Sequence, residues 1–162
     1  MNDDAAVRTL NRWARASPRL AMIIGCAAER LAVLEVGLML LLGLSGRRQS
    51  ALRMLAAVGA VYAASELLGR AWPRPRPFER LDDVTLLATH SAGRSFPSRH
   101  VASGLAMATI GAREHARLGW LMAAVAWALG ISRVAAGLHY PSDVGAGAAL
   151  GRLVGDLFTR GV

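Results

Sequence analysis

Residues 118–143 read LGWLMAAVAWALGISRVAAGLHYPSD, an apolar run that ends in a cluster of polar side chains. A helix needs about 20 predominantly apolar residues to cross a bilayer, and residues 118–136 provide such a run before Gly137 interrupts it. Pro141 suits the first turn of a following helix, which we expect over residues 144–158. This stretch therefore predicts two membrane helices joined by a short polar link.

Two further apolar runs, residues 51–69 and 98–112, lie upstream of this stretch. The loop between them, residues 70–97, is rich in arginine and proline, and its prolines exclude a continuous helix. Glycines recur at short intervals in the expected last helix, which is typical of tightly packed transmembrane helices. We therefore predict an all-α fold, a polytopic transmembrane helix bundle with five to six membrane-embedded helices.

The N-terminal part of the chain leaves two arrangements open. An apolar run follows Pro18 and ends at Gly46, but Glu29 and Arg30 interrupt it. Either a short interfacial or re-entrant helix precedes a spanning helix at residues 31–45, or one long tilted helix covers the whole run.

The length of the chain suits one domain, and we expect a single membrane-embedded domain over residues 1–162. Within it, residues 1–28 form the N-terminal interfacial or re-entrant part. Residues 5–17 mix arginines with Leu10 and Trp13, which predicts a basic amphipathic helix in the membrane interface. Residues 65–158 form the core that carries the functional motifs.

Composition narrows the possible partners. Hydrophobic residues make up 54% of the chain, above the roughly 45–50% that is usual in soluble domains. The formal net charge is +8, and all 19 basic residues are arginines, so any anion site must use guanidinium groups, which bind phosphate through paired N–H donors. The arginines are interleaved with apolar runs, which argues for membrane lipids and against nucleic acid as partners. Cys26 lies in an apolar stretch, and we expect a buried, inert thiol.

The charge of the connecting turns predicts the orientation. The turns at residues 46–53 and 113–117 lie on one membrane face, and by parity the loop at 70–97 and the link at 137–143 lie on the other. The first two turns are short and rich in arginine, so the positive-inside rule places them in the cytoplasm. We expect an integral protein of the cytoplasmic (inner) membrane with its polar site on the extracytoplasmic face.

Three polar clusters fall on that face: RAWPRPRP at residues 70–77, SFPSRH at 95–100 and SRVAAGLHYPSD at 132–143. In the third, Asp143 lies in the first turn of the expected helix, where the helix dipole favours a carboxylate. It can accept the proton of one nitrogen of His139 and leave the other free as a nucleophile. Taken alone, the pair is equally compatible with a capping aspartate beside an interfacial histidine.

The other two clusters also have structural explanations when taken singly. Ser98 is a favourable N-cap residue, so its hydroxyl and the first-turn amides can face an anion, with His100 placed to exchange a proton. An ordinary capped helix without a binding function would have the same sequence pattern. Prolines stiffen the loop that carries Arg76, but a basic loop there can equally bind anionic lipid. Gathered at one depth in a membrane bundle, these charged groups indicate a functional site.

The same residues carry a family resemblance. Residues 132–143 match the pattern Ser-Arg, five residues, His, three residues, Asp of the type 2 phosphatidic acid phosphatase superfamily. Ser98 and His100 resemble its Pro-Ser-Gly-His motif, and Arg76 with Pro77 resembles the end of its first motif. The segment GRAWPRPRPF at residues 69–78 and the short chain are further similar to undecaprenyl-diphosphate phosphatases of the bacitracin-resistance type.

The resemblance implies a metal-independent lipid phosphatase without a cofactor. His139 attacks phosphorus, Asp143 orients it, and His100 protonates the leaving oxygen and then activates water. The implied phosphate-binding residues are Arg76, Ser98, Arg133, Arg70 and Arg99. Two of these depart from the family pattern: Arg99 replaces a glycine, and Arg70 is the candidate to replace a lysine that the family has where Gly69 stands here.

We expect the substrate to be a lipid-linked phosphate, with undecaprenyl diphosphate hydrolysed to the monophosphate as the leading hypothesis. A phosphatase for phosphatidic acid, phosphatidylglycerophosphate or a polyprenyl-phosphoryl sugar phosphate is the nearby alternative. A non-enzymatic transporter subunit is the distant one. The oligomeric state stays open.

Overall fold

The computed structural model describes residues 2–159, which form seven helices and no extended sheet. The fold is all-α, as predicted. The helices are α1 (Asp3–Ala14), α2 (Pro18–Leu44), α3 (Arg48–Ala71), α4 (Pro77–Arg80), α5 (Arg99–Glu114), α6 (Ala116–Ala135) and α7 (Pro141–Thr159).

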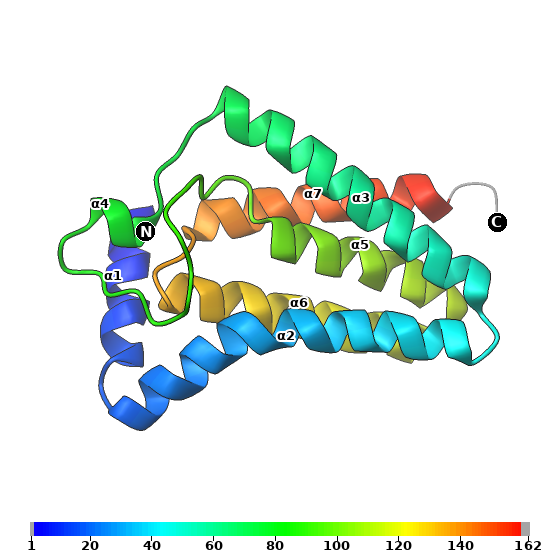
Figure 1. The fold of residues 1–162 in the computed structure, drawn as a ribbon, viewed down its shortest axis with the longest axis horizontal. Helices are drawn as coiled ribbons and strands as arrows, with labels where there is room; N and C mark the ends of the chain where they lie inside the picture. The colour runs from blue at the N-terminus through cyan, green and yellow to red at the C-terminus, as the bar shows by residue number, and fades with distance from the viewer. Residues whose placement is uncertain (1, 160–162) are drawn as a thin grey trace.

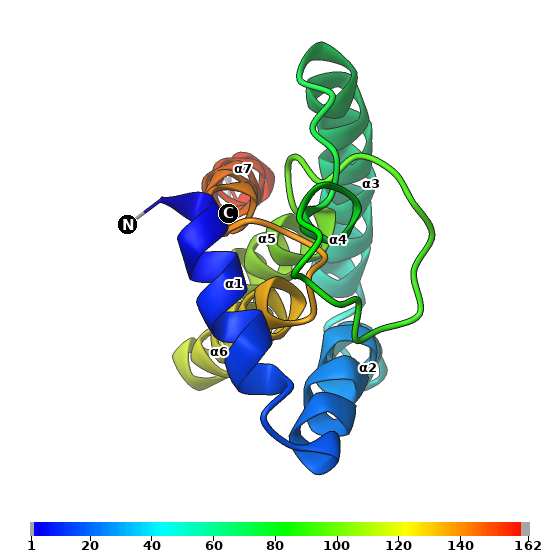
Figure 2. The same ribbon diagram turned by 90° about the vertical axis from the view of Figure 1, so that its left-hand side faces the viewer.

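Five long helices run along the bundle, and the short elements gather at one of its ends (Figure 1). Viewed from that end, α5 lies at the centre and α3, α6 and α7 surround it (Figure 2). The loop of residues 72–98 and the link of residues 136–140 meet at the same end, since the Leu87 amide donates to the Ala136 carbonyl at 3.2 Å. The opposite end holds the two short turns, where Arg47 pairs with Glu114.

The contact between α5 and α7 depends on three glycines. A Cβ built at Gly147 would lie 2.5 Å from the Ser98 carbonyl oxygen, and one at Gly151 would lie 2.3 Å from that of Ala102. A Cβ built at Gly155 would lie 2.6 Å from the Cβ of Thr109. These clashes confirm the close helix contact that small residues predicted, and they fix where the start of α5 sits relative to the start of α7.

The outer surface of the bundle is apolar. Large hydrophobic side chains are exposed along α2, α3, α6 and α7, among them Leu44, Leu67, Trp120 and Leu153. So many large exposed apolar side chains are not expected of a monomer in water. By length and composition, two of the described helices, α3 and α6, qualify as membrane-spanning.

The apolar run after Pro18 forms one long helix, so the second of the two expected arrangements is the correct one. The break at Glu29 that the other arrangement required does not occur; the Glu29 carboxylate accepts from the Thr89 amide, 2.6 Å away. Glu35 is buried against Gly104, where a Cβ would lie 2.2 Å from its Oε1. The prediction for Cys26 is wrong, because its side chain is exposed.

Helix α1 closes the end of the bundle at which the loops gather (Figure 2). The fully buried Asn11 donates to the carbonyls of Ala135 and Thr85, both at 2.8 Å, and accepts from the Thr85 amide at 3.0 Å. Arg8 pairs with Asp83 at 2.9 Å. The predicted amphipathic helix is therefore present, and several of its polar side chains hold the loop in place.

Candidate active site

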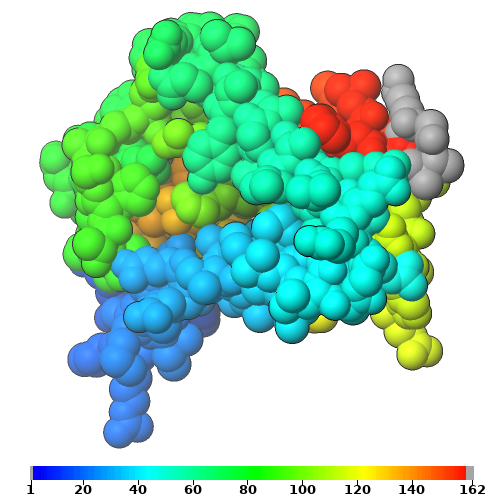
Figure 3. All heavy atoms as spheres, turned by 45° about the vertical axis from the view of Figure 1, so that its right-hand side comes forward, coloured from blue at the N-terminus to red at the C-terminus, as the bar shows by residue number. Residues whose placement is uncertain are grey.

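The surface of the molecule is hollowed between α2 and α3, and atoms of the α6–α7 link and of the start of α5 are visible in the hollow (Figure 3). A polar cavity of about 300 Å³ lies there, lined by Glu66 and Gly69 of α3, by the loop around His90 and Arg94, and by Arg76 and Arg99. Residues of the first two polar clusters line this cavity, and the third is connected to the second through the Ser98 amide, which donates to the Asp143 carbonyl. The three clusters therefore meet at one end of the bundle.

The turn before His139 follows from the glycine at the end of α6. Gly137 has a φ of +81°, a left-handed conformation that other residues adopt only with strain. The Leu138 amide donates to the Arg133 carbonyl at 2.9 Å, and the Gly137 amide donates to that of Val134 at 3.0 Å. This pair of bonds ends the helix in a Schellman motif and turns the chain back toward α5, so that His139 points into the bundle end.

His139 is held by a backbone carbonyl. Its Nδ1 lies 2.8 Å from the Ser95 carbonyl oxygen, which can only accept, so Nδ1 carries the proton and Nε2 is left unprotonated. The nearer Asp143 oxygen is 3.8 Å from Nδ1. Burial lowers the pKa of the imidazole to about 4; Asp143 opposes this shift, whereas the charges of Arg133 and Arg76 add to it. His139 is therefore a neutral, oriented imidazole at physiological pH.

Asp143 connects the three clusters. It lies in the first turn of α7, as predicted, and its side chain is fully buried. Its Oδ2 accepts from the Tyr140 amide at 2.8 Å, and its Oδ1 accepts from Nη1 of Arg74 at 2.9 Å. Its own carbonyl accepts from the Ser98 amide at 3.0 Å. The position of the acid thus depends on both preceding clusters, and its negative charge lies beside His139.

Two arginines near His139 are buried and lack carboxylate partners within residues 2–159. Arg76 donates through Nη1 to the Leu138 carbonyl, and Arg133 donates through Nη1 to that of Ala28, each at 2.9 Å. Within the same described residues, Nε of Arg76, Nε and Nη2 of Arg133 and Oγ of Ser98 are buried without any hydrogen bond. Burial lowers the pKa of Arg76, since unpaired buried cations are costly. An anion would satisfy these donors together.

His100 and Arg99 occupy the first turn of α5, directly after Ser98. His100 lies near His139, Arg133 and Arg99. Ser98 is the N-cap residue, as predicted, but its hydroxyl makes no capping bond, which leaves it free to donate elsewhere. The structure therefore brings seven of the eight predicted site residues to one place: His100, His139, Asp143, Arg76, Ser98, Arg99 and Arg133.

Comparison with known proteins accounts for this arrangement. Residues 50–162 match the sequence model of the PAP2 superfamily. The chain belongs to the PAP2 superfamily. It is 38% identical over 96 residues to the bacitracin transport permease protein BcrC of Bacillus licheniformis, and 35% identical over 86 residues to the undecaprenyl-diphosphatase BcrC of Bacillus subtilis strain 168. These matches cover 57% and 53% of this chain, but only 47% and 44% of the two relatives.

Solved structures resemble this PAP2 chain over nearly its whole length. LpxE of Aquifex aeolicus superposes with a TM-score of 0.76 at 26% identity, covering 94% of this chain and 91% of that one. The transmembrane PAP2-type phosphatidylglycerolphosphate phosphatase of Bacillus subtilis superposes with a TM-score of 0.75 over 96% of this chain and 82% of that one. Its identity of 23% supports a shared fold only.

Arg70 is the predicted site residue that the structure does not bring into this PAP2 site. Its side chain is 69% exposed and its Nε pairs with Glu66 at 3.0 Å. The arginine that reaches the cavity beside Gly69 is Arg94, which comes from the loop instead. A Cβ built at Gly69 would lie 3.0 Å from the Phe96 carbonyl oxygen and 3.6 Å from Nε of Arg94. Arg94 therefore places its side chain across the position where the family lysine would begin.

Sequence reasoning missed His90 and Arg94 as residues of the cavity, and it missed Asp3 as a partner of Arg74. His90 is near Arg76, Arg133 and Arg99, and burial lowers its pKa. Asp3 accepts from Nη2 of Arg74 at 2.9 Å. The segment between residues 88 and 95 reads ATHSAGRS, and a histidine and an arginine beside a helix-capping motif were the one available signal.

Proposed function

We propose that this protein is an integral-membrane lipid phosphatase that hydrolyses undecaprenyl diphosphate to the monophosphate through a phosphohistidine, without a metal or cofactor. The observation that carries this proposal is the position of neutral His139 beside the unpaired N–H donors of Arg76 and Arg133. A nucleophile with its proton on the far nitrogen and a set of buried donors for anionic oxygens are the two requirements of such a transfer.

In the first half of the reaction, Nε2 of His139 attacks the terminal phosphorus. An N–P bond forms, the bond from that phosphorus to the bridging oxygen of the diphosphate breaks, and His100 donates a proton to the bridging oxygen, which leaves with undecaprenyl monophosphate. The guanidinium groups of Arg76 and Arg133 and the hydroxyl of Ser98 stabilise the charge on the transferring group. Positive charge and fixed donors are what phosphoryl transfer needs most, and these side chains supply both.

In the second half, His100 removes a proton from a water molecule, which attacks the same phosphorus. The N–P bond breaks, inorganic phosphate leaves, and His139 returns to its neutral state. Asp143 acts throughout by holding negative charge next to Nδ1 while the imidazole carries the phosphoryl group. Its two strong hydrogen bonds, to the Tyr140 amide and to Arg74, keep it in this position.

The exposed apolar side chains support a membrane location for the whole chain as one domain. We propose that α2, α3, α5, α6 and α7 are embedded in the bilayer and that α1 lies at its surface. The turns around Arg47 and Arg113 lie at the end opposite the site (Figure 1). The positive-inside rule then places the site on the extracytoplasmic face of the cytoplasmic membrane.

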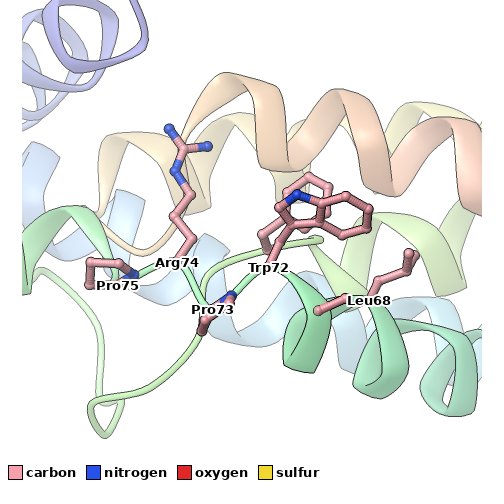
Figure 4. A pocket seen from close by; sticks show the side chains of 7 residues that line it. Leu68, Trp72, Pro73, Arg74 and Pro75 are labelled. Atoms are coloured by element: carbon pink, nitrogen blue, oxygen red, sulfur yellow. The ribbon is translucent and has the colours of Figure 1, made fainter.

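Apolar surface next to the site supports a lipid as substrate. A cavity of about 530 Å³ is lined mainly by Leu68, Trp72, Pro73, Pro75 and Phe96 (Figure 4). Arg74 also lines it, and its guanidinium group donates to Asp143. Phe96 lines both this cavity and the polar one. A hydrocarbon chain can therefore extend from the phosphate site past Phe96 onto a largely hydrophobic surface.

Substrate profiling tests this proposal. The purified protein in detergent should release phosphate from undecaprenyl diphosphate with a higher kcat/KM than from phosphatidic acid or phosphatidylglycerophosphate. A preference for the diacyl substrates would replace the polyprenyl assignment by the alternative lipid phosphatase. Absence of phosphate release from all three would favour the non-enzymatic transporter subunit.

A further inference from the structure

The polar cavity extends beyond the groups that the proposed mechanism uses. Arg76 lines it and donates to the carbonyl of Leu138, next to His139, while Glu66, His90, Arg94 and Arg99 line other parts of it. Its volume of about 300 Å³ is at the lower end of the range of roughly 300–1,000 Å³ for small-molecule sites, which is more space than one phosphate group requires. We call the part around Arg94 and Arg99 the outer region.

We propose that this outer region is a second phosphate subsite, in which Arg94 and Arg99 hold the lipid-attached phosphate of a diphosphate while His139 attacks the terminal one. The inference rests on the proposed function and adds to it the basis of selectivity for a diphosphate. Undecaprenyl monophosphate is then the leaving group, and its charge increases as the bridging P–O bond breaks.

Arg94 reaches the outer region because residue 69 is a glycine. Its side chain passes over Gly69, with Nε 3.6 Å from the position of a Cβ there. Its Nη2 lies 2.6 Å from Oε1 of Glu66, which also accepts from Arg70. One carboxylate thus faces two guanidinium groups, so the cluster keeps a net positive charge. Because the Arg94 side chain is 41% exposed, it can turn from Glu66 toward an entering anion.

Arg99 lies on the other side of the outer region. It has no ion pair within residues 2–159, and its guanidinium lies over the Tyr62 ring at 5.4 Å from the ring centre. It is one residue from Ser98 and one from His100, and its charge is felt by Arg76. Arg99 therefore follows Ser98 of the inner phosphate position directly in the chain, and it also lines the polar cavity.

The charges match the two parts of a diphosphate. Arg76 and Arg133 are buried and serve the transferring group, whereas Arg94 and Arg99 are exposed and line the polar cavity. A lipid diphosphate has a second anionic group directly next to the first, and guanidinium groups bind such oxygens through paired donors. A lipid monophosphate would leave the outer cations without an anion.

Calorimetric binding of two anions to the purified protein in detergent tests the subsite. The probes are methylene diphosphonate, which cannot be hydrolysed, and inorganic phosphate. Arg94→Gln and Arg99→Gln should each weaken diphosphonate binding by about 10-fold, equivalent to about 1.4 kcal/mol, and change the Kd of phosphate less than twofold. The control is Arg113→Gln at the far end of α5, which should change neither.

Equal losses for both probes, or no loss for diphosphonate, would overturn the second subsite. The binding experiment needs no turnover, so it separates this inference from the proposed function. If the wild-type protein shows the expected binding pattern but prefers a lipid monophosphate as substrate, the polyprenyl diphosphate assignment fails and the subsite stands. If it hydrolyses the diphosphate but the pattern is absent, only the subsite fails.

Discussion

Arg74 donates through Nη1 to Oδ1 of Asp143 at 2.9 Å, and the carboxylate that it holds is fully buried. The same guanidinium donates to Asp3 of α1 and lies over the Tyr140 ring, 3.7 Å from its centre. Arg74 therefore acts on the site through Asp143, as a positioning residue, and it links the N-terminal helix to the acid.

Replacement of Arg74 should impair turnover without removing the nucleophile. We expect Arg74→Gln to lower kcat by about 10- to 100-fold, because Asp143 loses a charged partner, which weakens its hold beside His139. The KM should change little, since Arg74 is not among the proposed phosphate donors. Arg80→Gln is the control, because Arg80 also contacts Tyr140 but pairs with Asp4. Equal effects of both substitutions would mean that Arg74 acts only through general stability.

Loss of the negative charge of Asp143 should reduce turnover more than loss of its partner Arg74. Asp143→Asn keeps an oxygen for the Tyr140 amide but removes the charge next to Nδ1, so kcat should fall by about 10²–10⁴, as for an orienting carboxylate in a catalytic triad. Folding should be retained, because Arg74 keeps its bond to Asp3. Thermal unfolding in detergent and steady-state kinetics check both statements, with Asp156→Asn in the exposed pair with Arg152 as the control. Near-normal turnover would remove Asp143 from the mechanism.

The low pKa of His139 predicts how phosphorylation depends on pH. The folded-state pKa of about 4 lies below the 6.5 of an ordinary imidazole. His139 therefore stays neutral between pH 6.5 and about 4, and it becomes protonated only as the pH falls through about 4. With p-nitrophenyl phosphate, whose leaving group needs no proton from His100, the initial burst of product should keep its rate from pH 7 to 5. It should then fall as the pH passes through about 4. A loss of rate centred near pH 6.5 would contradict this environment for His139.

Asn11 should be a structural residue rather than a catalytic one. Asn11→Ala leaves the buried carbonyl of Ala135 and both backbone groups of Thr85 without their partner. A buried polar group without a partner costs about 1–3 kcal/mol, so the thermal midpoint in detergent should drop clearly. The control is Arg12→Gln, an exposed position on the same helix. An unchanged midpoint for Asn11→Ala would show that α1 does not hold the loop.

Much of this structure could be predicted from the pattern of apolar runs. The helices observed at Arg48–Ala71, Arg99–Glu114 and Ala116–Ala135 follow directly from hydropathy and from the breaks at glycine and proline. The position of Asp143 in the first turn of α7 follows from Pro141. The site residues assemble because their motifs lie at helix ends that meet at one end of the bundle. Hydropathy and the conformational preferences of glycine and proline were sufficient to predict these features.

The remaining features depend on contacts that leave no pattern in the sequence. The acceptor for His139 is the backbone carbonyl of Ser95, and any residue at position 95 would provide it. The cation beside Gly69 comes from Arg94, across an irregular loop whose path is set by tertiary contacts such as those of Asn11. Arg70 pairs with Glu66, four residues earlier on the same helix, as helix geometry allows. This pairing holds the Arg70 side chain away from the site into which it was predicted to point.

The proposed mechanism requires that His139 become phosphorylated during turnover. Single-turnover labelling with a substrate that carries ³²P in the transferred group, with a metal chelator present, measures this directly. We expect an acid-labile, base-stable label on His139 in the wild-type protein and in His115→Gln, which alters an exposed histidine at the far end of the bundle. In His139→Ala we expect no label and a loss of turnover of at least about 10³-fold. Retained turnover in His139→Ala, or a wild-type protein that forms the label only with added divalent metal, would contradict the proposed mechanism.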